Sequence, residues 1–184
     1  MTDFAYKPTL TGELVVLRPM EEQDYEALFA AMNDPEVMRL TGSHGQISEE
    51  RAREWARTRK DQTDRLDLVI VDRKTDLVVG EVVLNMWDPD NQSCNFRILI
   101  GPAGQGRGLG SEATRMTVGY GFEQLGSHRI SLSVFPFNPR AERAYEKAGF
   151  KREGVLRDAL RWDGEWYDEV VMSVLATEWI PSEV

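Results

Sequence analysis

Hydrophobic residues recur along this chain with two spacings, which predict strands and helices in alternation. In residues 129–135, Ile130, Leu132 and Val134 alternate with polar residues, the period-two pattern of a half-buried strand. Other short β-branched runs are bounded by Gly, Pro, Asn and Asp, as strands usually are. These patterns predict about seven strands, at residues 13–18, 66–72, 77–87, 93–100, 129–135, 150–156 and 167–175.

Four segments show the three-to-four-residue spacing of amphipathic helices. In the first, Tyr25, Leu28 and Met32 share a helical face. Asn33-Asp34-Pro35 is expected to end it, because the residue before a proline avoids the α region. Residues 36–46 contain two glycines and are expected to form a loop or one short helical turn. The predicted helices cover residues 21–32, 48 to about 60, 111–125 and 139–148.

The order of these elements predicts an α/β protein with a mixed central sheet and helices on both faces. Residues 93–100 and 129–135 should form a parallel pair around the helix at 111–125. Ligands of such sheets lie beyond the carboxyl ends of the parallel strands. With 184 residues and no linker or repeat, we expect a single domain over residues 1–184.

The stretch Gln105-Gly106-Arg107-Gly108-Leu109-Gly110 lies between an expected strand and an expected helix. Backbone N–H groups of such a glycine-rich turn, with the helix N-terminus, make an anion-binding site. The stretch lacks the Lys-Ser/Thr pair of a P-loop, and Ser111 replaces the third glycine of the dinucleotide fingerprint. Two interpretations remain: a plain glycine-rich turn, or a pyrophosphate loop of the form Gln/Arg-x-x-Gly-x-Gly/Ala.

Composition narrows the classes of function. The net charge is −9, which argues against nucleic acid as a main partner and is compatible with a cationic substrate. One cysteine, Cys94, and two distant histidines predict no disulfide and no metal site. No apolar run is long enough to span a membrane, and residues 1–7 do not resemble a signal peptide. We therefore expect a cytosolic protein.

A second group of motifs follows the strand at 129–135, with Asn138 and then Tyr145-Glu146-Lys147-Ala148-Gly149-Phe150. With the glycine stretch and the opening Leu-x-Leu-Arg-Pro-like strand, the chain resembles the GNAT superfamily, and within it the RimJ/RimL-like N-acetyltransferases. The resemblance covers nearly the whole chain and implies the acyl-CoA N-acyltransferase fold. It implies acetyl-coenzyme A as co-substrate, no metal, and a homodimer as one arrangement.

The resemblance also implies roles for individual residues. The strand backbone at Ile98 and Ile100 would pair with the pantetheine amides where the parallel strands splay apart, and the glycine loop would hold the pyrophosphate. Tyr145 would lie near the thioester sulfur, as proton donor or hydrogen-bond donor to the thiolate; the alternative is a core aromatic. Lys147 is either near the adenosine phosphate or solvated. The expected coenzyme-binding residues are Ile98, Ile100, Gln105, Gly106, Arg107, Gly108, Leu109, Gly110, Ser111, Asn138 and Tyr145.

The chain departs from the family pattern beside the expected acyl site. Asn95 stands where many relatives carry a glutamate base, and Arg97 stands where a small residue is usual. An amide cannot accept the amine proton, so another base is needed. Glu81 is the first candidate, because burial can raise a carboxyl pKa into a useful range. A solvent-facing Glu81 is equally compatible with the sequence, and a water chain to Asp168 is a further alternative.

The sequence therefore predicts an acetyl-CoA-dependent N-acetyltransferase that acts by direct transfer in a ternary complex. The acceptor would be a primary amine, on a protein N-terminus or a small molecule. Transfer of succinyl or another acyl group, and a non-catalytic acyl-CoA sensor, are the alternatives. Trp162, Trp166 and Tyr167 are candidates for an acceptor pocket, a dimer contact or local packing.

Overall fold

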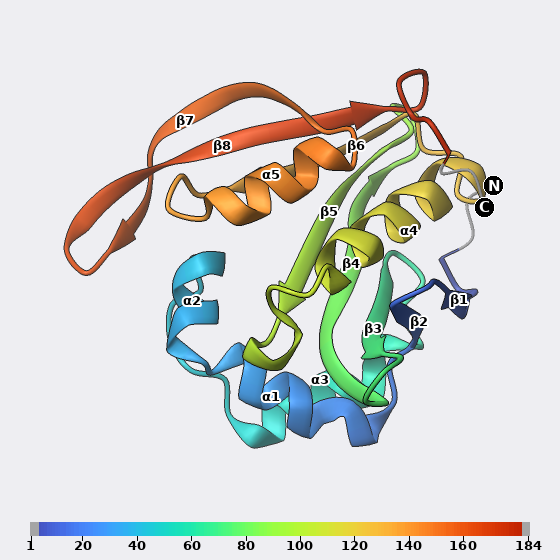
Figure 1. The fold of residues 1–184 in the computed structure, drawn as a ribbon, viewed down its shortest axis with the longest axis vertical. Helices are drawn as coiled ribbons and strands as arrows, with labels where there is room; N and C mark the ends of the chain where they lie inside the picture. Colours follow the sequence, from blue (N-terminus) through green and yellow to red (C-terminus); the bar gives the residue numbers. More distant parts are fainter. Residues whose placement is uncertain (1–3, 182–184) are drawn as a thin grey trace.

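The computed structural model describes residues 4–181, and its centre is one eight-stranded mixed sheet (Figure 1). The strand order is β1-β2-β3-β4-β5-β6-β8-β7, and only β5 and β6 pair in parallel. The strands are β1 Leu10–Thr11, β2 Val15–Pro19, β3 Leu66–Asp72, β4 Leu77–Asp88, β5 Ser93–Ile100, β6 Arg129–Val134, β7 Lys151–Trp162 and β8 Glu165–Leu175. This is the predicted GNAT architecture.

The expected number of about seven strands was one too few. The additional strand is β1, which pairs with β2. It has only two residues, too few for a hydrophobic pattern to reveal it. The last two strands are also longer than predicted. They extend to the Asp163-Gly164 turn, where both residues have positive φ (49° and 86°), as a two-residue hairpin turn requires.

The helices confirm the predicted ones and add a helix between them. They are η1 Glu22–Asp24, α1 Tyr25–Met32, α2 Pro35–Thr41, α3 Glu49–Arg59, η2 Pro102–Gly104, α4 Leu109–Glu123 and α5 Pro139–Lys147. The additional helix is α2, where a loop or one short turn was expected. Asp34 caps it by accepting a hydrogen bond from the Val37 N–H at 2.9 Å, and Pro35 occupies its first turn. The Asp-Pro pair that ends α1 therefore also starts α2.

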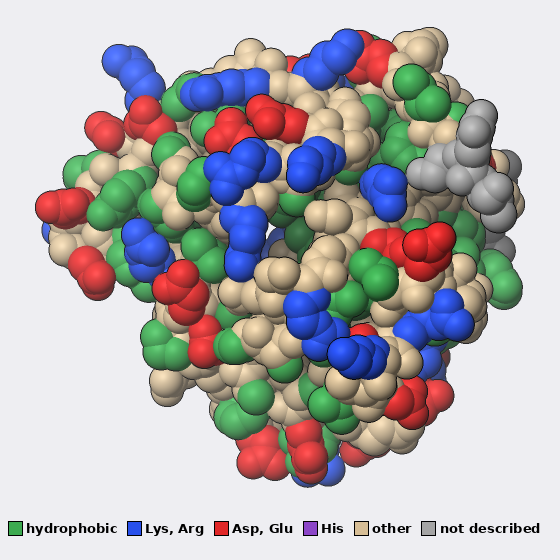
Figure 2. Space-filling view, viewed as in Figure 1, with side chains coloured by type: hydrophobic (Ala, Val, Ile, Leu, Met, Phe, Trp, Pro, Cys, Tyr) green, Lys and Arg blue, Asp and Glu red, His purple; other side chains and the backbone are tan. Residues whose placement is uncertain are grey.

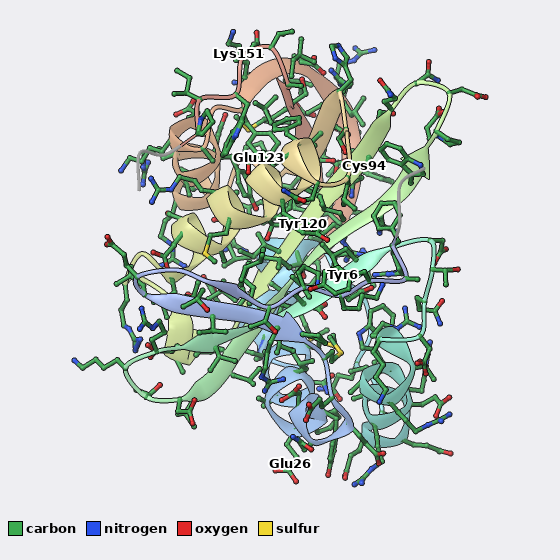
Figure 3. All side chains as sticks on the ribbon, turned by 90° about the vertical axis from the view of Figure 1, so that its right-hand side faces the viewer. Tyr6, Glu26, Cys94, Tyr120, Glu123 and Lys151 are labelled. Atoms are coloured by element: carbon green, nitrogen blue, oxygen red, sulfur yellow. The ribbon has the colours of Figure 1, made fainter. Side chains whose placement is uncertain are left out.

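The helices cover both faces of the sheet, as predicted. On one face, α1 and α3 pack against β3 around Leu28, Ala56 and Val69. On the other face, α4 packs Ala113 and Val118 into the larger core. Figure 3 shows α4, which carries Tyr120, and α1, which carries Glu26, on opposite sides of the central strands. Within residues 4–181 no helix is long and apolar enough to cross a membrane.

Strands β5 and β6 separate soon after they start. Their parallel pairing runs only from Ser93–Arg129 to Asn95–Ser131. Beyond this point β5 continues to Ile100 and pairs only with β4, so its other backbone edge is open. The glycine loop follows the end of β5, and α5 follows the end of β6, so this gap is where both sets of predicted motifs meet.

Candidate functional site

The glycine loop leaves the start of α4 open for an anion. Gly106 and Gly108 have positive φ values of 75° and 82°, which glycine adopts without strain. Gly108 is the N-cap of α4 and has no side chain to cap it. The N–H groups of residues 109–111 consequently have no acceptor within the part of the chain that the structure describes. This is the geometry of an anion-binding helix N-terminus.

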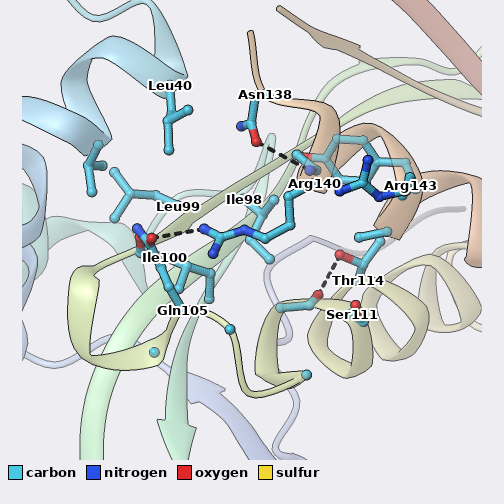
Figure 4. Close-up of a pocket in the computed structure, with 18 of the residues that line it drawn as sticks. Leu40, Ile98, Leu99, Ile100, Gln105, Ser111, Thr114, Asn138, Arg140 and Arg143 are labelled. Atoms are coloured by element: carbon cyan, nitrogen blue, oxygen red, sulfur yellow. Dashed lines mark hydrogen bonds between the residues drawn. The ribbon is translucent and has the colours of Figure 1, made fainter. Parts of the chain in front are cut away.

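A cavity of about 340 Å³ lies beside this loop, between the open edge of β5 and helix α5 (Figure 4). We call it the first cavity. Gln105 connects its two sides, because its Nε2 donates to the Ile100 carbonyl at 3.2 Å and its Oε1 accepts from Arg140 at 2.8 Å. It is lined by Val37, Leu40, Thr41, Ile98, Leu99, Ile100, Gly104, Gln105, Gly106, Gly108, Gly110, Ser111, Thr114, Asn138, Arg140, Ala141, Arg143, Ala144, Tyr145 and Lys147.

The first cavity is basic although the whole chain has a net charge of −9. Three cations of α5 line it, namely Arg140, Arg143 and Lys147. Figure 2 shows Lys and Arg side chains gathered over α5 beside a hollow in the surface. A local cluster of cations and free N–H groups in an acidic protein favours a ligand that carries phosphate groups.

Two of the predicted coenzyme-binding residues have side chains elsewhere. The Arg107 guanidinium forms an ion pair with Asp72, at the end of β3. Leu109 is buried in the core. Neither residue lines the first cavity, so only their backbone N–H groups remain as contacts for a ligand there.

Asn138 and Tyr145 come from the start and the end of α5. The Asn138 Oδ1 caps the helix by accepting from the Ala141 N–H at 3.2 Å, and its Nδ2 has no acceptor among the described residues. The Tyr145 ring packs edge-on against Phe96, with ring centroids 6.4 Å apart. Its hydroxyl has no hydrogen-bond partner within residues 4–181, and burial raises the pKa of Tyr145 to about 12. Tyr145 thus packs in the core and also lines the first cavity, a position that is compatible with either interpretation of this residue.

A second cavity, of about 400 Å³, begins at the inner end of the first. Leu40, Thr41, Ile98, Leu99, Asn138 and Tyr145 line both cavities, so the two adjoin. We call it the second cavity. Its remaining lining residues are Met32, Ser43, Gly45, Ile47, Trp55, Arg65, Glu81, Val83, Asn95, Phe96, Arg97, Ser133, Val134, Phe135 and Glu169.

Glu81 is the buried acid of the second cavity. Only 7% of its surface is exposed, so the solvent-facing alternative was wrong. Burial raises the pKa of Glu81 to about 7, with a further upward contribution from Asp67, while Arg97 and Arg65 oppose the shift. Its Oε2 and the Trp55 Nε1 are both buried without a hydrogen bond of ordinary length in the described residues, although the Trp55 N–H still favours the ionised carboxylate and opposes the rise of the Glu81 pKa. Such a carboxyl can exchange a proton with a ligand near neutral pH.

Strand register explains the position of Glu81. It pairs with Val69 of β3 on one side and Leu99 of β5 on the other. Because side chains alternate between the faces of a sheet, Glu81 shares its face with Asp67 and Arg97, its diagonal neighbours. This is the face covered by α1 and α3, opposite to α4.

Of the other residues singled out near the expected acyl site, Asn95 lines the second cavity and Asp168 lies outside it. Asn95 lines the second cavity and donates to the Asn85 Oδ1 at 3.2 Å. Asp168 does not line either cavity; its Oδ1 accepts from the Asp158 N–H at 3.0 Å, within the irregular part of the β7–β8 hairpin. Its neighbour Glu169 lines the second cavity instead.

The aromatic residues near the hairpin turn lie outside both cavities. Trp162 stacks on His44 with ring centroids 5.3 Å apart, and Tyr167 packs edge-on against Phe137. Trp166 is 59% exposed. Packing thus accounts for Trp162 and Tyr167, and none of the three residues lines the first or the second cavity.

Sequence reasoning missed several residues of the second cavity. Leu40 and Thr41 belong to α2, which was not predicted as a helix. Trp55 lies in α3, Arg65 in the loop just before β3 and Glu169 in β8, and no local motif joins them. Within residues 4–181 no group of three or more His, Cys, Asp or Glu side chains is placed to hold a metal ion.

Comparison with known proteins identifies similar chains. The protein-family model described as "Acetyltransferase (GNAT) domain" matches residues 15–151 of this chain. The uncharacterized N-acetyltransferase p20 of Bacillus licheniformis is 30% identical over 176 residues, which cover 93% of this chain and 98% of that protein. The [ribosomal protein uS5]-alanine N-acetyltransferase of Escherichia coli is 33% identical, but only over 89 residues, 48% of this chain and 46% of that protein.

A solved structure gives the clearest comparison of shape. Spermidine N-acetyltransferase from Vibrio cholerae, in complex with CoA and spermine, superposes with a TM-score of 0.83. The two chains are 25% identical, and the match covers 91% of this chain and 98% of that one.

Proposed function

Because the chain belongs to the GNAT acetyltransferase family, we propose that it transfers an acetyl group from acetyl-coenzyme A to a primary amine, directly within a ternary complex. One observation carries this proposal. The basic first cavity and the second cavity adjoin at Tyr145, with a buried carboxyl in the wall of the second. A donor in the first cavity and an acceptor in the second would meet there without a covalent enzyme intermediate.

The first cavity suits the donor in three respects. Its free N–H groups at the start of α4 complement a pyrophosphate, and Arg140, Arg143 and Lys147 add positive charge. The open backbone edge of β5 at Ile98 and Ile100 offers hydrogen bonds to amide groups, as a neighbouring strand would. A long ligand with phosphates at one end and amides in the middle matches this order of groups.

Glu81 is the proposed general base. The amine nitrogen attacks the thioester carbonyl carbon, the nitrogen–carbon bond forms and the carbon–sulfur bond breaks. Glu81 accepts the proton that the nitrogen loses, directly or through one water molecule. With its pKa near 7, a large share of Glu81 is ionised at neutral pH and can act as base.

Tyr145 is proposed to stabilise the thiolate that leaves. Its raised pKa keeps the phenol protonated over the whole physiological pH range. A protonated hydroxyl with no partner in the described residues is available to donate a hydrogen bond to sulfur. This suits stabilisation of the developing negative charge better than complete proton transfer from Tyr145, and solvent can supply the final proton.

The acceptor is proposed to be a primary amine, on a small molecule or a protein N-terminus. The RimJ/RimL-like assignment has its support in the 89-residue similarity to the alanine N-acetyltransferase. The structural likeness to spermidine N-acetyltransferase supports a small-molecule amine. The homodimer and the cytosolic location remain predictions from the sequence.

The test is an assay of free thiol release from acetyl-coenzyme A with a panel of amines and peptides, with product masses measured in parallel. We expect acetyl-coenzyme A consumption that depends on an amine and yields its N-acetyl product. Succinyl-coenzyme A in a second series would reveal the alternative donor. Tight binding of acetyl-coenzyme A in calorimetry without acylation of any acceptor would instead favour the sensor alternative.

A further inference from the structure

Arg97 is an unpaired cation in the wall of the second cavity. It lies on β5 opposite Val83, on the face that carries Glu81, and it is exposed. Within residues 4–181 its guanidinium has no hydrogen bond and no ion pair. An arginine that lines a cavity without a partner is a site for an anionic group of a ligand.

The other arginine of the wall is already compensated. Arg65 binds both carboxylate oxygens of Asp67 at 2.7 Å, and its side chain is only 16% exposed. Arg65 therefore fixes the wall, whereas Arg97 remains available for a ligand. The two arginines differ in their neighbours along the chain, since Asp67 lies two residues from Arg65, whereas β5 places no acid next to Arg97 and its diagonal neighbour Glu81 forms no ion pair with it.

The acidic residues of this wall do not form a site for a polycation. Glu81 and Glu169 are the carboxyl groups that line the cavity within the described residues, and Glu81 is partly protonated near neutral pH. Arg97 adds a positive charge that opposes at most these two carboxylates. A polyamine would bring several ammonium groups to a wall without excess negative charge, which is unfavourable.

We propose, on the basis of the proposed function, that the acceptor is a small primary amine that also carries a carboxylate, the chemistry of an amino acid. Arg97 binds the carboxylate, and the amine lies at Glu81. The two residues are diagonal neighbours on paired strands, with Cβ atoms roughly 7 Å apart by ordinary sheet geometry. Side chains that reach from these positions can hold an amine and a carboxylate that are separated by a few bonds.

The choice of a carboxylate over a phosphate follows from the charges. One free guanidinium offers two parallel N–H donors, which match the two oxygens of a carboxylate. A dianionic phosphate would gain the same pair of hydrogen bonds but would face the nearby Glu81 and Glu169 with twice the charge. The cavity volume of about 400 Å³ is in the range for a small ligand.

The experiment compares amine acceptors with and without a carboxylate. Free amino acids, the matching carboxamides and spermidine are assayed with acetyl-coenzyme A, for the wild type and Arg97→Gln. We expect the best amino acid to have a kcat/KM at least about 10-fold above that of its amide, a typical value of one charge-assisted contact. Arg97→Gln should remove this preference, so that the amino acid and its amide differ by less than about threefold in kcat/KM, and the loss for the amino acid should appear mainly in KM.

Two further variants control the interpretation. Arg115→Gln removes an exposed arginine on α4 that lines neither cavity, and it should leave the preference intact. Arg97→Lys keeps the charge but loses the two-donor fork, so an intermediate preference is expected. If spermidine is the best acceptor, or if Arg97→Gln affects an amino acid and its amide equally, the inference is overturned.

A binding measurement separates this inference from the proposed function. Calorimetry in the presence of coenzyme A measures the affinity for an amino acid and for its amide without turnover. Arg97-dependent binding of the amino acid, with no acetylation, would support this inference and contradict the proposed function. Acetylation of amines with no Arg97-dependent preference for a carboxylate would support the function and contradict this inference.

Discussion

The two cavities that adjoin at Tyr145 are built in different ways. The proposed phosphate-binding end of the first cavity comes from one contiguous loop, residues 104–111, which offers backbone N–H groups held by two glycines with positive φ. The charged wall of the second cavity comes from separate residues of β4, β5 and β8, together with Arg65 just before β3. Its contacts are side chains, and register brings them together.

This difference has a chemical consequence. A backbone anion site can be changed only by altering the loop conformation or by filling the space, so many sequences can build the same site. A side-chain wall changes with each substitution, as Asn95 and Arg97 illustrate beside the proposed acyl site. A protein built in this way can keep one donor while its acceptor changes. The following predictions test this division, from the largest expected effect to the smallest.

The largest effect is expected for Gly108→Asp. The added carboxylate would stand at the N-terminus of α4, against the proposed pyrophosphate. We expect the Kd of acetyl-coenzyme A, measured by calorimetry, to rise by about 100-fold or more from loss of the anion site and like-charge repulsion. Positive φ strains any residue with a Cβ, so a modest loss of thermal stability is expected, partly offset because Asp is favourable at a helix N-terminus.

Gly126→Asp is the matched control for this variant. Gly126 also has a positive φ, 68°, and a Cβ there would meet nothing within 4 Å, but it lies at the other end of α4. It should bind acetyl-coenzyme A like the wild type. An unchanged affinity in folded Gly108→Asp would show that the loop is a plain glycine-rich turn.

Tyr145→Phe tests the junction of the cavities. It retains the ring that packs against Phe96 and removes only the hydroxyl. We expect kcat to fall by about 10²-fold, the lower range for loss of a catalytic donor, with little change in acetyl-coenzyme A affinity. Tyr167→Phe removes a hydroxyl outside both cavities and is the control. Unchanged turnover in Tyr145→Phe would leave Tyr145 as a packing residue only.

The ionisation of Glu81 should also change how the free energy of unfolding depends on pH. The fold raises its pKa from 4.5 to about 7, so its protonated form is favoured in the folded state. The associated stability is fully present below the unfolded pKa and is lost as pH rises through about 7. Between pH 5 and pH 8 the wild type should lose about 2 kcal/mol of unfolding free energy that Glu81→Gln does not lose.

Denaturant titrations at several pH values measure this difference. A parallel pH dependence for the two proteins would mean that Glu81 ionises normally in the fold. It would then be unsuited to the role of a base tuned by burial. This stability readout does not require the acceptor to be known.

The smallest effect is expected for Arg140→Ala. The residue adds a charge to the first cavity and binds Gln105 Oε1, but it is exposed. Exposed ion contacts contribute little, so we expect the Kd of acetyl-coenzyme A to rise only about two- to fivefold, with a smaller effect at high salt. A change as large as that in Gly108→Asp would mean that side chains, not the backbone, dominate the first cavity.

The same division governs what the sequence could predict. The loop of the first cavity is contiguous, so its glycine motif could be recognised from residue spacing alone. The strands and helices around it also had strong hydrophobic periodicity. Helix α2 was missed because Asp34-Pro35 was interpreted only as a stop, although Asp34 also caps the next helix. Strand β1 has too few residues to show a period.

The second cavity was less predictable for a physical reason. Glu81 was a candidate, but strand alternation alone could not tell which face would be covered by α1 and α3. Arg65, Trp55 and Glu169 are distant in sequence and carry no shared motif. These residues come together only through strand order and register, which are difficult to predict from a single sequence.

The central claim is that Glu81, buried in the wall of the second cavity, accepts the amine proton. The pH dependence of kcat/KM for an amine acceptor, in the wild type and in Glu81→Gln, tests it most directly. We predict that the wild-type value rises with pH through an apparent pKa of about 7. In Glu81→Gln this transition should be absent, and the value above the transition should be about 10²-fold lower. The same transition in Glu81→Gln, at undiminished activity, would contradict the claim.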